Sequence, residues 1–324
     1  MINIEDIQVK WQSLNKIDGK IKSLMIDGKC VPDLFIGLNP EFKRCLILKL
    51  PAEFIADFQS SVKQNLALEL FPESKWIVLT LLDEQFNDLF DDLIFSIYNK
   101  ISNIADPSLY VSDFLQTYYK WSEFFQDNNS TLLSDEDIQG LFGELLVLNE
   151  MVRANSATEI NNILNNWKGP YDARHDFIGD EKNIEVKTKV VSSIYIKISS
   201  EYQLQPDAGK ELELHVVSII QNSATGFTLK DLVLLIKSYV TSKLGDYTII
   251  LTTLSQKGLT ARNLSDYDHL KFMPVSIQGF YVTNSAFPRL IRSELPDAIN
   301  TVNYKLNLTE LKNFIIFENP LQWK

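Results

Sequence analysis

The segment from Asp176 to Val190 constrains the fold of this chain more than any other, because it predicts a charged hairpin. Its sequence, DFIGDEKNIEVKTKV, places the polar turn 179–183 between two runs that read as strands. In a strand, successive side chains point to opposite faces. The turn would bring Asp176 beside Glu185, and Lys187 would share the face of Glu185. We therefore expect two carboxylates and one ammonium group to meet on one face of a sheet.

The tripeptide Glu185-Val186-Lys187 is not specific by itself. The same Glu-x-Lys pattern occurs at Glu41-Phe42-Lys43, Glu73-Ser74-Lys75 and Glu310-Leu311-Lys312. None of these three has a carboxylate on a hairpin partner strand. The hairpin context therefore favours the copy that begins at Glu185. The alternative interpretation is a solvated, charged hairpin without a function.

The residue types of this hairpin suit phosphodiester hydrolysis. That reaction needs a divalent metal to polarise the phosphate and to lower the pKa of a water molecule. Magnesium prefers oxygen ligands and keeps several waters, so Asp176 and Glu185 are sufficient carboxylates. The backbone carbonyl of Val186 offers another ligand. Lys187 could orient the water and offset negative charge in the transition state. The pattern predicts a Mg²⁺ site that also accepts Mn²⁺.

A second acid lies in an apolar helix upstream, in the stretch 140-GLFGELLVLNEM-151. Glu144 is flanked by leucines at helical spacing. Gly140 and Gly143 are poor helix residues that cost about 1 kcal/mol each against alanine, so we expect this helix to pack closely against another element. A buried glutamate needs a partner or a metal. The alternative is that Glu144 lies at the edge of the apolar stripe and reaches water.

Composition excludes several classes of protein. Hydrophobic residues make up 45% of the 324 residues and charged residues 23%, a profile typical of a folded soluble protein. The formal net charge of −11 argues against a nucleic-acid coat that uses the whole surface, so DNA would need a local basic patch. The two cysteines and three histidines show no zinc-binding spacing. No signal peptide or membrane span is visible, and we expect a cytoplasmic protein without membrane contact.

The chain is predicted to have three parts. Residues 1–82 contain short apolar runs bounded by Pro, Gly or Asn, which indicate an antiparallel β module. Residues 83–133 show helical spacing and form a helical connector. Residues 134–324 form a mixed α/β core. In that core we expect helices near 134–152, 159–167 and 229–242. We expect its later strands near 194–199, 211–220, 246–251, 274–283, 300–306 and 313–317.

Longer stretches of the chain resemble a known superfamily. The order GLFGELLVL, W-x-G-P, HDF, IEVK and 196-IKISSEYQL-204 resembles PD-(D/E)XK nucleases. More narrowly, the chain is similar to a bacterial family of PD-(D/E)XK motif proteins of uncharacterised function. The stretch 280-FYVTNSAFPRLIRSELPDAINTVNYKLNL-308 resembles that family as well. The resemblance covers roughly residues 138–308, and more loosely the whole chain.

The resemblance implies a fold and a set of site residues. It implies a restriction-endonuclease-like mixed sheet of about four strands, flanked by helices, with a metal site at one edge. Glu144 matches the acid on the first core helix, and Glu185 and Lys187 match the ExK pair. Asp176 matches the motif aspartate, with His175 where proline would stand, and Asp172 is a rival aspartate. The resemblance also implies a catalytic role for Gln203.

Two functions from different classes follow. The first is a Mg²⁺-dependent DNA endonuclease of restriction–modification or phage-defence type, which is implied by the resemblance. A local patch would bind double-stranded DNA, and its members would be Lys168, Arg174, Lys182, Lys187, Lys189 and Lys197. The second is a catalytically silent DNA-binding or assembly subunit of a multi-protein restriction complex. Partner proteins or a homodimer are compatible with both functions. The chain has no GxGxxG, GxxxxGK[ST] or GxSxG motif, which disfavours a small-molecule enzyme.

Overall fold

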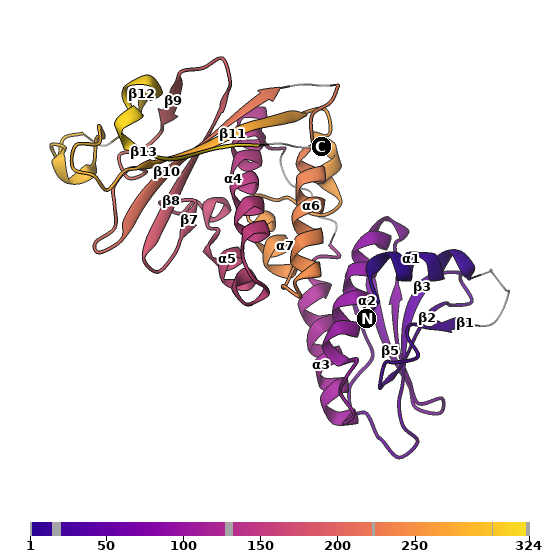
Figure 1. Cartoon of the computed structure of the whole chain (residues 1–324). Coiled ribbons are helices and arrows are strands. Elements are labelled where there is room, and N and C mark those ends of the chain that lie inside the picture. Colours follow the sequence, from indigo (N-terminus) through magenta and orange to yellow (C-terminus); the bar gives the residue numbers. More distant parts are fainter. Residues whose placement is uncertain (1, 15–20, 127–131, 222–223, 300, 322–324) are drawn as a thin grey trace. The chain divides into compact units, whose positions relative to one another are not determined.

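The computed structural model describes residues 2–14, 21–126, 132–221, 224–299 and 301–321. The chain divides into two compact units, Met1–Asn129 and Ser130–Lys324 (Figure 1). Each unit contains helices and a β-sheet. The expected fold class, α/β of the α+β kind with an N-terminal antiparallel β module, is therefore confirmed.

The first unit is built on a six-stranded sheet with the order β1-β2-β3-β6-β5-β4. Every neighbouring pair in it is antiparallel. Its strands are β1 (Lys22–Met25), β2 (Asp33–Leu38), β3 (Arg44–Lys49), β4 (Ser61–Lys63), β5 (Leu66–Phe71) and β6 (Trp76–Leu81). The middle strands β3 and β6 are buried along most of their length, because apolar side chains occupy both of their faces.

This unit begins with a helix that its sequence pattern does not predict, α1 (Ile4–Ser13). A capping box closes its start, in which Asn3 and Asp6 each bind the backbone N–H of the other. Its buried side chains are Ile7 and Trp11, four residues apart. Two buried residues in ten give a weak periodic pattern, so the segment was not recognised as helical.

Two longer helices follow, α2 (Asn87–Ile101) and α3 (Pro107–Ser122). They lie within the predicted connector 83–133, and both belong to the first unit. The two helices pack against each other. The side chain of Asn65, next to β5, donates a hydrogen bond to the carbonyl of Phe125 just after α3. Residues 127–131 of the expected connector lie outside the described residues, and the division of the chain at 82 and 133 stays a prediction.

The second unit is built on a five-stranded sheet with the order β13-β11-β10-β8-β7. Strands β8 and β10 are parallel, and the other neighbouring pairs are antiparallel. The strands are β7 (Phe177–Ile178), β8 (Lys182–Val190), β10 (Glu211–Gln221), β11 (Phe272–Tyr281) and β13 (Ile315–Pro320). Strand β10 lies in the centre and is buried along most of its length.

Helices cover one face of this sheet (Figure 1). They are α4 (Asp135–Ala154), α5 (Ile160–Asn166), α6 (Leu229–Ser242) and α7 (Thr248–Ser255). Helix α4 contacts β8 and α6. A Cβ atom on Gly143 would lie 1.8 Å from Oγ1 of Thr188 on β8, whereas one on Gly140 would meet nothing within 4 Å. Close packing of α4 is therefore confirmed at Gly143 and not at Gly140.

The prediction of a strand at 246–251 is wrong, since α7 occupies most of that range. Its Thr and Ile residues are β-branched and favour a strand by propensity. The Asp246 side chain instead accepts hydrogen bonds from the N–H and the hydroxyl of Thr248, which starts the helix. Ile250, Leu251 and Leu254 then bury one helical face. Tertiary packing therefore overrides local propensity here.

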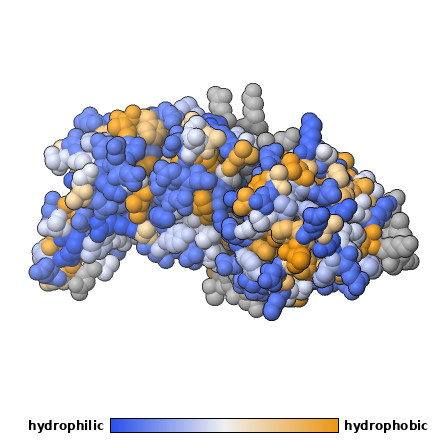
Figure 2. All heavy atoms as spheres, turned by 90° about the horizontal axis from the view of Figure 1, so that it is seen from below, coloured by the Kyte–Doolittle hydropathy of each residue, from blue (hydrophilic) through white to orange (hydrophobic). Residues whose placement is uncertain are grey.

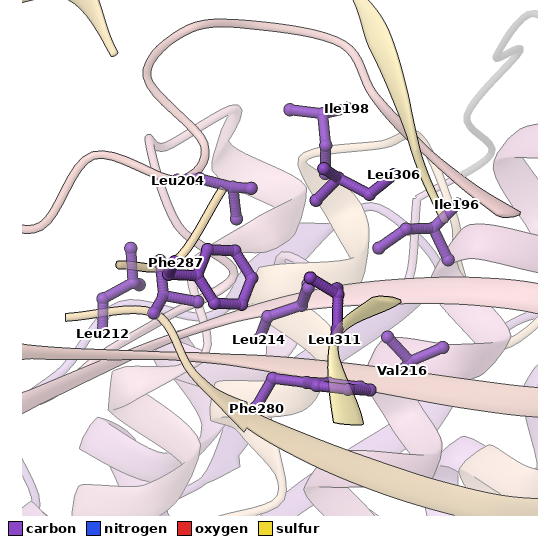
Figure 3. Close-up of a cluster of buried hydrophobic side chains, with 11 residues drawn as sticks. Ile196, Ile198, Leu204, Leu212, Leu214, Val216, Phe280, Phe287, Leu306 and Leu311 are labelled. Atoms are coloured by element: carbon purple, nitrogen blue, oxygen red, sulfur yellow. The ribbon is translucent and has the colours of Figure 1, made fainter. Parts of the chain in front are cut away.

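A two-stranded antiparallel ribbon, β9 (Tyr195–Ile198) with β12 (Tyr304–Asn307), packs on the other side of the sheet. Figure 3 shows the apolar cluster between this ribbon and the sheet. Ile196, Ile198 and Leu306 of the ribbon belong to the same buried cluster as Leu214 and Val216 of β10. The second unit is thus layered as ribbon, sheet and helices.

Hydrophilic side chains predominate on the face of the molecule that Figure 2 shows, and hydrophobic side chains reach it in separate places. The described helices include none that is both long enough and apolar enough to cross a membrane.

Candidate active site

The short strand β7 positions Asp176. It pairs with β8 only through Phe177–Ile184 and Ile178–Asn183. Just beyond that pairing, Oδ2 of Asp176 accepts a hydrogen bond of 2.7 Å from the backbone N–H of Val186. The N–H and the carbonyl of one strand residue point to the same edge. The Val186 carbonyl therefore points to the edge of β8 where Asp176 lies.

Glu185 and Lys187 lie on β8, where their side chains are alternate and share a face. Oε1 of Glu185 and Nζ of Lys187 are 2.7 Å apart. The side chain of Glu185 is 2% exposed and that of Lys187 is 17% exposed. A solvated hairpin would leave both in water, so this alternative does not fit the structure.

Glu144 comes to the same place from α4. Its Oε2 accepts a hydrogen bond of 2.8 Å from the indole Nε1 of Trp167. A Cβ atom on Gly169 would lie 2.1 Å from Oε2 of Glu144 and 3.0 Å from Oδ1 of Asp176. Both carboxylates therefore lie against Gly169. The backbone N–H groups of Lys168 and Gly169 also donate to the carbonyl of Asp176, at 2.6 and 3.0 Å.

Burial changes the acid–base properties of all four groups. It raises the pKa of Glu144 well above its usual value, and the negative charge of Asp176 raises it further. Burial also raises the pKa of Asp176, against the opposing effects of Lys187 and the Val186 N–H. It raises the pKa of Glu185 to about 8, again with help from Asp176. Burial would lower the pKa of Lys187, but the carboxylates of Glu185 and Asp176 outweigh it and raise that pKa.

The charges of this cluster do not balance. Glu144, Asp176 and Glu185 would carry three negative charges when ionised, and Lys187 supplies one positive charge. Buried charges are costly unless they are paired. The excess of two negative charges requires either protons, which the raised pKa values indicate, or a divalent cation.

The donor set fits a hard divalent cation. Carboxylate and carbonyl oxygens are the ligands that Mg²⁺ prefers, and the ion is held by one or two carboxylates while it keeps several waters. Asp176, Glu185 and the Val186 carbonyl supply such a set. Within the described ranges, however, no three His, Cys, Asp or Glu side chains are gathered closely enough to hold an ion as they stand. Each acid instead hydrogen-bonds to a protein group.

The rival aspartate and the predicted glutamine lie in different surroundings. Asp172 has a left-handed backbone conformation with φ of 55°, its side chain is 84% exposed, and it forms an ion pair with Lys257. Gln203 lies in the turn after β9, where its Oε1 accepts the N–H of Ser199 at 2.8 Å. No hydrogen bond or ion pair between described residues links Gln203 to the three acids. Its catalytic role stays a prediction.

The predicted DNA-binding cations lie in different surroundings, and most of them contact a protein group of their own. Arg174 pairs with Asp207 and Lys182 pairs with Glu213, both at 2.9 Å. Nζ of Lys189 donates to the carbonyl of Ser193, and burial lowers its pKa. Nζ of Lys168 lies 5.3 Å from the centre of the Tyr171 ring. Lys197 is exposed on β9.

Two residues that position the acids were not recognised from the sequence. Trp167 holds Glu144, and Gly169 leaves the space that Glu144 and Asp176 occupy. Both belong to the W-x-G-P motif, which was noted without a role. As a sequence motif it carries the resemblance but assigns no role to the tryptophan or the glycine. Their contact with a helix more than twenty residues upstream could not be deduced from it.

A comparison with family models identifies the family of this chain. A family model described as "Putative PD-(D/E)XK family member, (DUF4420)" matches residues 7–309. Searches of curated proteins and of solved structures give no match. The family match spans both units and includes every candidate residue named above. The chain therefore belongs to the DUF4420 family of putative PD-(D/E)XK proteins.

Proposed function

We propose that this protein is a Mg²⁺-dependent endonuclease that hydrolyses phosphodiester bonds in double-stranded DNA. The observation that carries the proposal is the buried cluster of three carboxylates and one lysine. Its excess of two negative charges equals the charge of one divalent cation. Family membership supports the nuclease class.

Each residue has a role in this proposal. Asp176, Glu185 and the Val186 carbonyl would hold the cation. A bound cation would polarise the scissile phosphate and lower the pKa of a water molecule. Glu144, oriented by Trp167, would accept hydrogen bonds from the water shell. The Lys187 ammonium, held by Glu185 at 2.7 Å, would bind a phosphate oxygen or the attacking water and offset developing charge.

A direct test is cleavage of supercoiled plasmid DNA by the purified full-length chain, with Mg²⁺, Mn²⁺ or EDTA. The proposal predicts metal-dependent nicking or linearisation that Lys187→Ala abolishes. Glu213→Gln is the matched control, because Glu213 is also a buried glutamate and lies on the neighbouring strand β10, where it pairs with Lys182 and His215. Cleavage that survives in Lys187→Ala would contradict the proposal.

We further propose that the activity serves restriction or phage defence in the cytoplasm, alone, as a homodimer or with partner proteins. The resemblance to defence-associated PD-(D/E)XK motif proteins supports this. The test compares plaque formation on cells that express the chain with its genomic neighbours and on cells that express Lys187→Ala instead. Equal plaque numbers would contradict a nuclease role in defence.

The alternative is a catalytically silent DNA-binding or assembly subunit. It is favoured by the finding that no three metal-binding side chains in the described residues are already gathered around one point. The same plaque experiment separates the two functions. A silent subunit would protect cells equally well with Glu185→Gln or Lys187→Ala, whereas a nuclease would not.

A further inference from the structure

The outer face of the β9–β12 ribbon carries two lysines directly opposite each other. The register pairs Lys197 with Lys305 and Tyr195 with Asn307. Ile196 pairs with Leu306, and these two are buried against the sheet. Since side chains alternate along a strand, the lysine and Tyr195–Asn307 pairs share the opposite, outward face. We call these four side chains the ribbon face.

Among the residues that the structure describes, this lysine pair has no ion-pair partner. Like charges directly opposite each other on neighbouring strands destabilise a sheet. Neither Lys197 nor Lys305 forms an ion pair with any residue that the structure describes, and both are exposed. By contrast, Arg174 and Lys182 are neutralised by Asp207 and Glu213. The ribbon face is therefore a local positive site on a chain whose net charge is −11.

The ribbon lies on the same side of the sheet as part of the candidate active site. Paired residues of parallel strands point to the same face, and the register pairs Glu185 with Leu214 and Lys187 with Val216. Leu214 and Val216 are the side chains on which the ribbon packs (Figure 3). Strand β9 also begins five residues after β8 ends. The ribbon is therefore the layer next to Glu185 and Lys187.

We propose that the ribbon face binds duplex DNA and presents it to this site. The proposal rests on the proposed nuclease function. A two-stranded ribbon fits the major groove of B-DNA, which is about 12 Å wide. A ribbon in the groove has the phosphates of the two DNA strands on its two sides, and the proposal requires one of these strands to reach past the ribbon to the sheet layer that carries Glu185.

The four side chains suit this occupant. Lys197 and Lys305 neutralise phosphates by charge. The side-chain oxygen of Asn307 already accepts the N–H and the hydroxyl of Thr309, at 3.1 and 2.8 Å. Its amide N–H₂ is a donor of the kind that base acceptors in the major groove require. Tyr195 is 47% exposed and offers an aromatic surface and a hydroxyl.

The experiment measures binding of a fluorescein-labelled 30-base-pair duplex to full-length protein by anisotropy at several salt concentrations. Every protein carries Glu185→Gln, so that cleavage does not interfere. The double substitution Lys197→Glu/Lys305→Glu is compared with Lys49→Glu/Lys100→Glu, which makes the same change of net charge at two exposed lysines of the first unit. The ribbon variant should bind about 10- to 100-fold more weakly, and the control should bind within about twofold of its parent.

Lys197→Ala/Lys305→Ala gives a second measurement. It should lower the slope of log K against log salt concentration by about 2, one for each lost phosphate contact. Its melting temperature should not fall, because a like-charge pair has been removed. Weaker binding would then not be explained by unfolding. Equal affinity and an equal salt slope in the parent and both ribbon variants would overturn the proposal.

Failure of the ribbon proposal and failure of the proposed nuclease are distinguishable. If Lys187→Ala abolishes cleavage while Lys197→Glu/Lys305→Glu cuts and binds like wild type, the nuclease stands and the ribbon proposal is overturned. If wild type cuts nothing but duplex binding depends on both lysines, the ribbon proposal is supported and the nuclease fails. Absence of duplex binding by the parent at low salt overturns the ribbon proposal.

Discussion

Both units bury acidic side chains, but they neutralise them differently. In the first unit, Asp91 of α2 is 2% exposed and accepts hydrogen bonds from the Trp11 indole at 2.7 Å and from Arg44 at 3.0 Å. Arg44 also lies 4.7 Å from the centre of the Trp11 ring. One negative charge therefore meets one positive charge. In the second unit, three buried acids share the single positive charge of Lys187.

The cluster around Asp91 is a structural ion pair, whereas the cluster around Glu185 lacks positive charge. Burial raises the pKa of Asp91 just as it raises the pKa of Glu185. A raised pKa therefore does not distinguish the two clusters. The number of charges distinguishes them. The negative charge of Asp91 is matched by the positive charge of Arg44, whereas the Glu185 cluster requires protons or a cation. Strand β3 and helices α1 and α2 are joined by the first cluster, which gives it a structural role.

The largest expected effect is on catalysis. Glu185→Gln should lower metal-dependent DNA cleavage about 10³-fold or more, because several kcal/mol of charge stabilisation are lost with the cation. Stability in EDTA should be unchanged or higher, since a repelling buried charge is removed. Plasmid cleavage and urea unfolding measure the two quantities. A large loss of stability in EDTA would mean that Glu185 has a structural role like that of Asp91.

The converse substitution should affect stability and not catalysis. Arg44→Ala leaves Asp91 buried without its cation and should lower the free energy of unfolding by about 3 kcal/mol, less than a fully buried pair would lose because Arg44 is partly exposed. Urea unfolding measures the loss. Cleavage by the folded fraction should equal wild type. A selective loss of cleavage would contradict the assigned difference between the clusters.

Stability without metal should depend on pH. The folded pKa of Glu185, about 8, lies above its usual value of 4.5, so the folded protein binds the extra proton between these values. The related stability is fully present below pH 4.5 and is lost as the pH rises from 4.5 through 8, on the order of 5 kcal/mol, because one pKa unit corresponds to about 1.4 kcal/mol. Urea unfolding in EDTA from pH 5 to pH 9 should show this decline, and Glu185→Gln should flatten it. Parallel curves for both proteins would be the contrary result.

The sequence predicted the local part of the site and not its long-range part. Asp176 and Glu185 are joined by a hairpin, so alternation and turn residues were sufficient to bring them together. Glu144 was identified because an acid interrupts an apolar helix face. The hydrogen bond from Trp167 and the close approach of Gly169 depend on how α4 packs, which no local pattern encodes.

The same distinction holds for the fold. Strands β2, β3, β5 and β6 of the first sheet are predicted because each run is short, apolar and bounded by turn residues, whereas the short strands β1 and β4 are not predicted. The parallel pairing of β8 with β10, and the pairing of Ile198 with Tyr304 across more than one hundred residues, require tertiary contacts. Helix α7 was mistaken for a strand because propensity and packing disagree there.

A smaller effect on cleavage is expected from a substitution that moves one of the acids without removing it. Gly169→Ala would place a Cβ atom against Glu144 and should move its carboxylate away from Asp176. Cleavage should fall about 10- to 100-fold, while stability changes by about 1 kcal/mol. Cleavage kinetics and thermal melting measure both changes. Wild-type cleavage by Gly169→Ala would show that the position of Glu144 does not matter to the reaction.

The most direct test of the charge comparison is calorimetric titration of Mn²⁺ into the full-length protein at pH 8. We predict that wild type and Arg44→Ala bind the ion, and that Glu185→Gln and Asp176→Asn lose this binding while they stay folded. If wild type binds no Mn²⁺, or if Glu185→Gln binds it as tightly as wild type does, the carboxylate cluster is not a metal site.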